Sequence, residues 1–566
     1  MAANGSMRRK TYDSPDALKP RATVSHATQT PEASPVDTMP AQLLPQVPTS
    51  GRAASSSNPL MRRKQSSPMM PPFMVSAPGK VIVYGEHAVV HGKAAIAAAI
   101  SLRSYLLVSF LSKSHRTVTL RFPDIQLEHS WDIDELPWDA FSAKDKKKYY
   151  YDMVTSLDPD LVEAIQPHVN SVSPKVPEQL RKIQQASATS FLYLFCSLAS
   201  RKTPPCVYTL RSTIPIGAGL GSSASIAVCL STALLLQIRA LSGPHQDQPP
   251  QESELQIERI NRWAFVGEMC IHGNPSGVDN TVSAGGKAVL YQRMNYNKPP
   301  MVAPIWNFPE LPLLLVNTRQ SRSTAIEVAK VATLREAHPA LTENILNAIG
   351  LVTESAHKLL TSPDFDPKSP SSLKHLGDLV TINHGLLVSL GVSHPKLERI
   401  REIIDHTGIG WTKLTGAGGG GCAITILKPQ PQTVHNINGN GVHHSDESSE
   451  DSEDSEDVDC SASIISTRTK LKHKILDSLE VKLENEGFQK FETTLAGDGV
   501  GVLWPAVLHN LNEEEGGEEI DQEKFLRAEG TEGIERLVGV SSSARRRLQI
   551  DVREGWKFWR PWETET

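Results

Sequence analysis

Hydrophobic positions along the chain follow two periods, which predict two kinds of element. Short stretches that alternate between apolar and polar residues predict strands with one buried face. Longer runs that are apolar on all sides, or that repeat every three to four residues, predict helices. The predicted strands are Phe73–Ala77, Lys80–Tyr84 after a turn at Pro78–Gly79, Arg103–Phe110, Thr117–Phe122, Val207–Ser212, Leu311–Asn317, Trp411–Leu414, Cys422–Leu427 and two within Phe488–Leu503. The predicted helices are Ser187–Ala199, Ser222–Ile238, Leu255–Cys270, several before Ile404, and one whose apolar face is Leu471, Ile475, Leu479 and Leu483.

The mixture of strands and helices, without strict βαβ alternation, predicts an α+β protein of two domains, 73–302 and 303–505. Residues 1–72 are rich in Pro and Ser and lack a sustained apolar period, so we expect a disordered extension. A disordered acidic insert is expected over 430–466. Residues 506–566 form an extension of unassigned role, with an aromatic cluster able to dock. That cluster is Trp556, Phe558, Trp559 and Trp562.

Charge is distributed unevenly over the chain, whose formal net charge is −5. Residues 1–72 carry nine Lys or Arg against four acids, whereas 445–459 carries nine acids and no base. Residues 506–566 carry 14 acids against nine bases. The rest of the chain, outside these three segments, is weakly positive, which fits small anionic substrates and is too little for a nucleic-acid groove. We therefore expect no nucleic-acid partner.

Cysteine usage and hydropathy indicate a reduced cytoplasmic protein. The six cysteines form no CxxC pair and no zinc-ligand spacing. The N-terminus lacks the apolar stretch of a signal peptide, and the longest apolar run, around Ile226–Ile238, is too short to span a bilayer.

The glycine-rich stretch Gly217-Ala218-Gly219-Leu220-Gly221-Ser222-Ser223 lies between a predicted strand and a predicted helix. Glycines let the backbone approach an anion, and the helix start adds unpaired N–H donors. A hydroxyl there can ligate Mg²⁺ that bridges two phosphates. The stretch is neither a Walker A loop nor in a Rossmann setting. Taken alone, a glycine loop of this kind is better explained as a flexible turn with a serine cap.

Two further elements carry candidate chemistry. Pro78-Gly79-Lys80 and Gly85-Glu86-His87 place one lysine and one histidine on a tight segment, where solvated or loop side chains are the plainer interpretation. The run Gly416–Gly421 precedes a strand. A β-turn with a bulge is possible, but so many glycines cost backbone entropy, so close approach of a backbone or ligand explains the run better.

Together the three elements resemble the superfamily of galactokinase, homoserine kinase, mevalonate kinase and phosphomevalonate kinase (GHMP kinases), and within it the mevalonate kinase family. The resemblance is carried by Val75–Gly92, by Glu268 with Ile271–Asn280, and by Lys413–Cys422. It runs from about Phe73 to Leu503 outside the insert.

The resemblance implies a fold and an activity. The expected fold has an N-terminal domain related to a ribosomal-protein fold and a ferredoxin-like C-terminal domain, with the active site between them. The expected reaction moves the γ-phosphoryl group of ATP, with Mg²⁺, to the 5-hydroxyl of (R)-mevalonate in isoprenoid and sterol synthesis. The family also implies a homodimer and feedback inhibition by farnesyl and geranyl diphosphates at the ATP site.

Residue roles follow from the same resemblance. Asp279 is the expected catalytic base, and Lys80 helps to bind ATP and activate the hydroxyl. Ser223 and Glu268 are the expected Mg²⁺ ligands, while His87 and Thr324 contact mevalonate. The expected ATP contacts are Lys80, Asp124, Ser212, Gly217, Ala218, Gly219, Leu220, Gly221, Ser222 and Ser223. The animal members of the family have Asn where this chain has Asp124. The third glycine motif is expected to support the phosphate loop.

Three alternatives are weighed against this prediction. Phosphomevalonate kinase would need additional Lys or Arg for its extra phosphate, and neither Val75–Gly92 nor His272–Asn280 supplies them. A non-catalytic GHMP-fold regulator would have lost the base, the lysine or a metal ligand, yet all are present. An acidic-tract scaffold would explain the insert alone.

Overall fold

The computed structural model describes residues 70–142, 154, 156–245, 247–294, 300–428, 474–510, 517–539 and 553–562. The predicted extension 1–72, apart from residues 70–72, and the acidic insert 430–466 lie outside this part of the chain. Residues Ser67–Thr566 form one compact unit, so the proposed boundary near residue 302 stays a prediction. None of the described helices is long and apolar enough to cross a membrane.

A central antiparallel pair, β1 (Phe73–Tyr84) and β2 (Ala94–Phe110), organises the main sheet, which has 13 strands among the described residues. The first part of β2 pairs with β6 (Ala288–Gln292), and its last part pairs with β5 (Cys206–Ser212). Between them, β2 meets β11 (Gln489–Leu495) at a single position. One long strand therefore joins the sheet of the N-terminal half to that of the C-terminal half.

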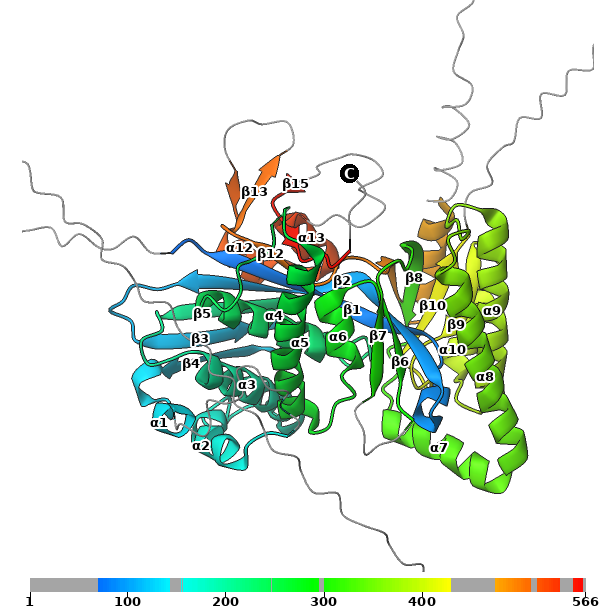
Figure 1. Ribbon diagram of the computed structural model, residues 1–566, viewed down its shortest axis with the longest axis horizontal. Coiled ribbons are helices and arrows are strands. Elements are labelled where there is room, and N and C mark those ends of the chain that lie inside the picture. Colours follow the sequence, from blue (N-terminus) through cyan, green and yellow to red (C-terminus); the bar gives the residue numbers. More distant parts are fainter. Residues whose placement is uncertain are drawn as a thin grey trace, which may run out of the picture. The chain divides into compact units, whose positions relative to one another are not determined.

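Most of the remaining strands extend both halves of this sheet, three near the end of the chain form a second sheet in the order β14-β13-β15, and helices cover the main sheet (Figure 1). The strands are β3 (Thr117–Phe122), β4 (Leu127–Asp132), β7 (Met301–Ile305), β8 (Leu311–Asn317), β9 (Gly410–Leu414), β10 (Cys422–Leu427), β12 (Gly501–Leu503), β13 (Val507–Asn510), β14 (Glu518–Glu519), β15 (Arg553–Glu554) and β16 (Lys557–Phe558). The helices are α1 (Trp138–Ser142), α2 (Pro159–Asn170), α3 (Glu178–Leu198), α4 (Ser222–Gln237), α5 (Pro250–His272), α6 (Val278–Gly285), α7 (Thr324–Ala337), α8 (Pro339–Leu360), α9 (Pro370–Ser389), α10 (Pro395–Asp405), α12 (Gln522–Arg527) and α13 (Gly530–Val538). Short 3₁₀ turns are η1 (Ala88–His91), η2 (Pro123–Ile125) and η3 (Ile133–Glu135).

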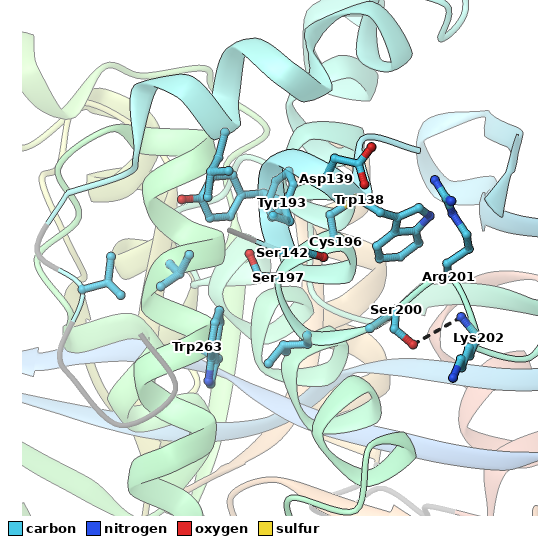
Figure 2. A pocket seen from close by; sticks show the side chains of 16 residues that line it. Trp138, Asp139, Ser142, Tyr193, Cys196, Ser197, Ser200, Arg201, Lys202 and Trp263 are labelled. Atoms are coloured by element: carbon cyan, nitrogen blue, oxygen red, sulfur yellow. Dashed lines mark hydrogen bonds between the residues drawn. The ribbon is translucent and has the colours of Figure 1, made fainter. Parts of the chain in front are cut away.

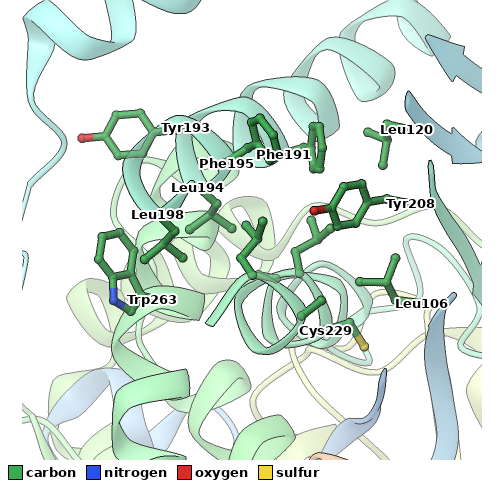
Figure 3. Packing of buried hydrophobic residues seen from close by; sticks show 14 of the residues in the cluster. Leu106, Leu120, Phe191, Tyr193, Leu194, Phe195, Leu198, Tyr208, Cys229 and Trp263 are labelled. Carbon is green, nitrogen blue, oxygen red and sulfur yellow. The ribbon is translucent and has the colours of Figure 1, made fainter. Parts of the chain in front are cut away.

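Helices α3, α4 and α5 cover one face of the N-terminal half (Figure 1). Helix α4 is apolar all round, which suits a helix packed between the sheet and other helices. Aromatic side chains fill the space beside it, as Figure 3 shows; the rings of Phe191 and Tyr208 meet edge to face with centroids 5.2 Å apart. The Ser225 hydroxyl donates to the Ala77 carbonyl at 2.7 Å, which fixes α4 on β1.

The opposite face of β1 and β2 is covered by the end of the chain. Along β1, Phe73 and Val75 contact the α3–α4 side, whereas Met74 belongs to a second core with Phe525 and Val538 of α12 and α13. Successive strand residues point to opposite faces, so a strand apolar at every position needs both faces covered.

The predicted docking aromatics contact different parts of the fold. Trp556 packs against this second core, Trp559 belongs to the core on the α3–α4 side, and the ring of Trp562 lies 5.6 Å from that of Trp306. Strand β16 pairs with β12, which in turn pairs with β1. Trp559 is fully buried, and its indole N–H donates to the Gln256 side-chain oxygen at 3.1 Å. The described part of 506–566 is therefore a structural layer of the fold, a role that the sequence left unassigned.

Most predicted elements match the structure to within a few residues. The predicted turn at Pro78–Gly79 is wrong, because β1 continues through it with a shift of register between Pro78 and Lys80. A bulge re-aims side chains without ending the strand. The amphipathic helix after the insert spans 474–485, and Gly487 follows it with a left-handed φ of 78°.

Candidate active site

The predicted base and lysine form an ion pair. Lys80 follows the bulge in β1, and Asp279 lies in the first turn of α6. The Lys80 Nζ is 3.1 Å from Asp279 Oδ1; the lysine side chain is buried, while that of Asp279 is 34% exposed. The lysine thus holds a carboxylate whose remaining surface faces open space.

The first glycine-rich stretch connects β5 to α4 and touches this pair directly. The Lys80 backbone N–H donates to the Leu220 carbonyl at 2.8 Å. Gly221 has a φ of 73°, and a Cβ there would lie 3.1 Å from Lys80 Cγ, so this position requires glycine. Gly221 also caps α4 with no side-chain hydrogen bond, which leaves the first N–H groups of the helix available to an anion.

A cavity of about 690 Å³ extends from the ion pair along this loop. One end is polar, with Gly217, Gly219–Ser223 and Arg322, and the other end is apolar, with Leu120, Phe122 and Ile125. Thr324 lines the polar end as well. This arrangement suits a ligand with a polyanionic end and a flat apolar end.

A smaller cavity of about 250 Å³ is lined by η1, by the start of α6 and by the end of β6. Lys80 and Asp279 line this cavity as well as the large one. Tyr291 lies in its wall, and Arg293 supplies a second cation beside Lys80 among the described lining residues. The ion pair therefore stands at the junction of two ligand-sized spaces.

The predicted metal ligands lie beside the ion pair. Glu268, on α5, has a side chain only 4% exposed, and its Oε1 has no hydrogen-bond partner among the described residues. Burial raises the pKa of Glu268 to about 7, with a further rise from Asp279, while Ser223 and Lys80 partly offset it. The Ser223 hydroxyl is 3.1 Å from His272 Nε2.

This donor set fits a hard divalent cation. A buried carboxylate oxygen without a donor, next to a hydroxyl, offers the oxygen ligands that Mg²⁺ prefers. Among the described residues, no group of three or more His, Cys, Asp or Glu could hold a metal by itself. The cation would therefore complete its shell with ligand phosphates and water.

Arg322 is a site residue that the sequence reasoning missed. It lies between β8 and α7 and donates to the carbonyl groups of Ala218 at 3.3 Å and Gly418 at 3.5 Å. A Cβ at Gly421 would be 2.6 Å from Arg322 Nε, so the third glycine motif makes room for this side chain. Burial lowers the pKa of the Arg322 guanidinium. The sequence did offer one signal for Arg322, because it lies two residues before the predicted contact Thr324.

Four predicted ligand contacts, Asp124, Ser212, Ala218 and His87, lie outside the walls of both cavities. Asp124 accepts from Arg211 Nε at 3.0 Å and from the Ser212 N–H at 2.8 Å, so its carboxylate is engaged by protein groups. His87 Nε2 is 2.8 Å from the Ala417 carbonyl, and burial lowers the pKa of its ring. The structure thus gathers Lys80, Asp279, the loop residues, Ser223 and Thr324, with Glu268 buried beside them.

Another cavity, of about 700 Å³, lies between α1, α3 and α5 (Figure 2). Trp138, Tyr193 and Trp263 line it, with Arg201 and Lys202 at its edge. None of the predicted site residues belongs to its wall, so we place the chemistry at the Lys80–Asp279 junction.

Comparison with known proteins agrees with this geometry. Family models for the GHMP kinases N terminal domain and the GHMP kinases C terminal domain match residues 188–287 and 368–437. A mevalonate kinase of Aspergillus fumigatus is 58% identical over 98% of this chain and 95% of its own length. The chain belongs to the mevalonate kinase family. A Gibberella zeae member is 61% identical over 88% of this chain and 90% of its own length. A Candida albicans member is 38% identical over 86% of this chain and 99% of its own length. Membership confirms the predicted α+β GHMP kinase fold and an ATP-dependent kinase.

Proposed function

We propose that this member of the mevalonate kinase family moves the γ-phosphoryl group of ATP to the 5-hydroxyl of (R)-mevalonate at the Lys80–Asp279 junction. The observation that carries the proposal is one ion pair shared by a large cavity with a phosphate loop and a small cavity with a second cation. The mevalonate kinases that resemble the chain over nearly its whole length support the choice of acceptor.

ATP fits the large cavity in one orientation. Its triphosphate would lie on the backbone N–H groups of Gly217–Gly221 and on the start of α4, with Arg322 and Lys80 beside it. The base would lie at the apolar end, near Phe122 and Ile125. Phosphoryl transfer is largely loose, so fixed position and stabilised charge contribute most of the rate.

Mevalonate fits the small cavity, with its 5-hydroxyl directed at Asp279. As the hydroxyl oxygen bonds to the γ-phosphorus, the bond from that phosphorus to the bridging oxygen breaks and ADP leaves. The hydroxyl proton passes to the free side of the Asp279 carboxylate, which Lys80 holds at 3.1 Å. Lys80 also offsets negative charge on the transferring oxygens.

Mg²⁺ would be held by the Ser223 hydroxyl and the Glu268 carboxylate, and it would supply positive charge that offsets the negative charge of the phosphates. We expect Glu268→Gln and Ser223→Ala each to raise the Mg²⁺ concentration for half-maximal rate about ten-fold. Glu258→Gln, an exposed change on the same helix, should leave the titration unchanged. If both site variants titrate like wild type, the metal assignment is wrong.

Changes to residues on the acceptor side should affect KM for mevalonate and KM for ATP differently. Arg293→Gln should raise KM for mevalonate about ten-fold and leave KM for ATP unchanged, because a guanidinium near Lys80 suits the substrate carboxylate. From the family resemblance, His87→Ala should also raise KM for mevalonate more than KM for ATP. The exposed change Arg262→Gln serves as control. The reverse ordering for either site variant would assign that residue to the nucleotide.

An ADP-release assay with three acceptors separates the candidate activities. We expect release with mevalonate and none above background with phosphomevalonate or galactose. Faster release with phosphomevalonate would favour the neighbouring kinase, and no release with any acceptor would favour a non-catalytic member.

Three further expectations rest on the family resemblance. These are a homodimer, a cytoplasmic location, and inhibition by farnesyl or geranyl diphosphate in competition with ATP. The polar and apolar ends of the large cavity suit the diphosphate and the chain of such inhibitors.

A further inference from the structure

We propose that the C-terminal segment, residues 517–539 and 553–562, positions the apolar wall of the nucleotide cavity through Arg211. The inference rests on the proposed function only in taking that cavity as the ATP site. Arg211 lines neither cavity, so it is a positioning residue.

The first contact in this chain of interactions is at the end of α12. Arg211, on β5, donates from Nη1 to the carbonyl groups of Phe525 at 2.9 Å and Leu526 at 2.8 Å, and from Nη2 to that of Ala528 at 2.6 Å. Carbonyl groups at the end of a helix lack partners within it, and a cation there also interacts favourably with the helix dipole. The Arg211 side chain is 7% exposed, so these bonds are shielded from water.

The second contact is with the cavity wall. Nε of the same guanidinium donates to Asp124 Oδ1 at 3.0 Å, and Asp124 Oδ2 accepts from the Ser212 N–H at 2.8 Å. Asp124 is the central residue of η2, and the adjacent Phe122 and Ile125 line the apolar end of the cavity. One guanidinium therefore holds the end of α12 and the η2 wall together.

The C-terminal segment is itself firmly seated, so it can act as a support. Phe525 is fully buried against residues that include Met74 and Tyr105. Further along, Trp559 is buried, and Arg560 pairs with both carboxylate oxygens of Asp498 at 2.9 Å. If α12 loosened, Arg211 would lose three acceptors and its grip on Asp124 would relax.

The test measures whether changes at Arg211 and at Phe525, the two ends of this series of contacts, weaken the binding of ATP and leave that of mevalonate unchanged. We expect Arg211→Gln to raise KM for ATP about ten-fold, since it removes hydrogen bonds to a charged group. Phe525→Ala should raise it several-fold. In both variants kcat should fall by less than about three-fold, and KM for mevalonate should stay within about two-fold.

A double variant and a matched control make the test specific. If Phe525 acts through Arg211, the double variant should raise KM for ATP no more than the larger single change does. Arg116→Gln is the control, because Arg116 also pairs with an aspartate, Asp134, and donates to a backbone carbonyl, yet lines neither cavity. It should leave both KM values unchanged.

Several results would overturn the proposal. Three results would each mean that the segment contributes only to the general stability of the protein. These are a folded Arg211→Gln with wild-type KM for ATP, equal rises in both KM values, and additive effects in the double variant. If Phe525→Ala does not fold, Arg211→Lys decides: it keeps the charge but cannot reach both partners, so its KM for ATP should lie between those of wild type and Arg211→Gln. A wild-type protein without mevalonate-dependent ADP release would instead refute the proposed function.

Discussion

Replacing Asp279 by asparagine is expected to lower kcat by at least about 100-fold, the low end for losing acid–base assistance. The change keeps the size of the side chain and removes the proton acceptor, whose carboxylate lies 3.1 Å from Lys80. ATP binding should persist, because the phosphate loop and the apolar wall are untouched. Steady-state rates at saturating substrates, with nucleotide binding measured by titration calorimetry, check both parts.

Two comparisons sharpen this result. Lys80→Met should lower kcat and weaken ATP binding together, since Lys80 lines the nucleotide cavity as well as contacting Asp279. Asp160→Asn replaces another aspartate in the first turn of a helix, α2, far from both cavity walls, and should change neither constant. Near-wild-type turnover of Asp279→Asn would remove this carboxylate from the mechanism.

The largest stability effect is expected for Lys413→Met. Lys413, on β9, and Glu86, before η1, form an ion pair with both side chains fully buried. Asn383 of α9 donates to the other Glu86 oxygen at 2.9 Å, and burial lowers the pKa of Lys413. Removal of the lysine leaves a buried carboxylate without its counter-charge, which destabilises by about 3–5 kcal/mol. Urea unfolding followed by tryptophan fluorescence measures the loss.

The double variant Glu86→Gln with Lys413→Met separates the charge effect from lost packing. Because it leaves no buried charge, it should regain much of the stability lost by Lys413→Met alone. A loss below about 1 kcal/mol for Lys413→Met would mean that the pair is not held in a dry interior.

The periodic elements were predictable because their cause is local. The run Ser222–Ile238 is apolar on all sides, and α4 spans Ser222–Gln237 in the structure. The glycine loop before it and the Lys80 segment were singled out from their residues, whereas the roles of Lys80 and Asp279 came from the resemblance. The structure brings all three together. Pro78–Gly79 misled because the same residues can make a turn or a bulge, and the pairing of β1 with β2 decides between them.

Other features depend on contacts between residues far apart in the chain. Arg211 and Phe525 are 314 residues apart, and no local sequence pattern around either of them predicts their contact. Asp124 was assigned to ATP from its position, but Arg211 and Ser212 occupy its carboxylate. One signal was available: Tyr105–Val108 is apolar at every position, which indicates a strand covered on both faces, and the second face is covered by C-terminal residues that include Phe525 and Val538.

The most direct test of the central claim is a single-turnover reaction with γ-³²P-labelled ATP, Mg²⁺ and (R)-mevalonate, with the product identified by NMR. We predict that the label moves to the oxygen of the primary 5-hydroxyl, in wild type at least about 100-fold faster than in Asp279→Asn. Label found only in inorganic phosphate, on the tertiary hydroxyl, or transferred equally fast by the variant would contradict phosphoryl transfer at the Lys80–Asp279 junction.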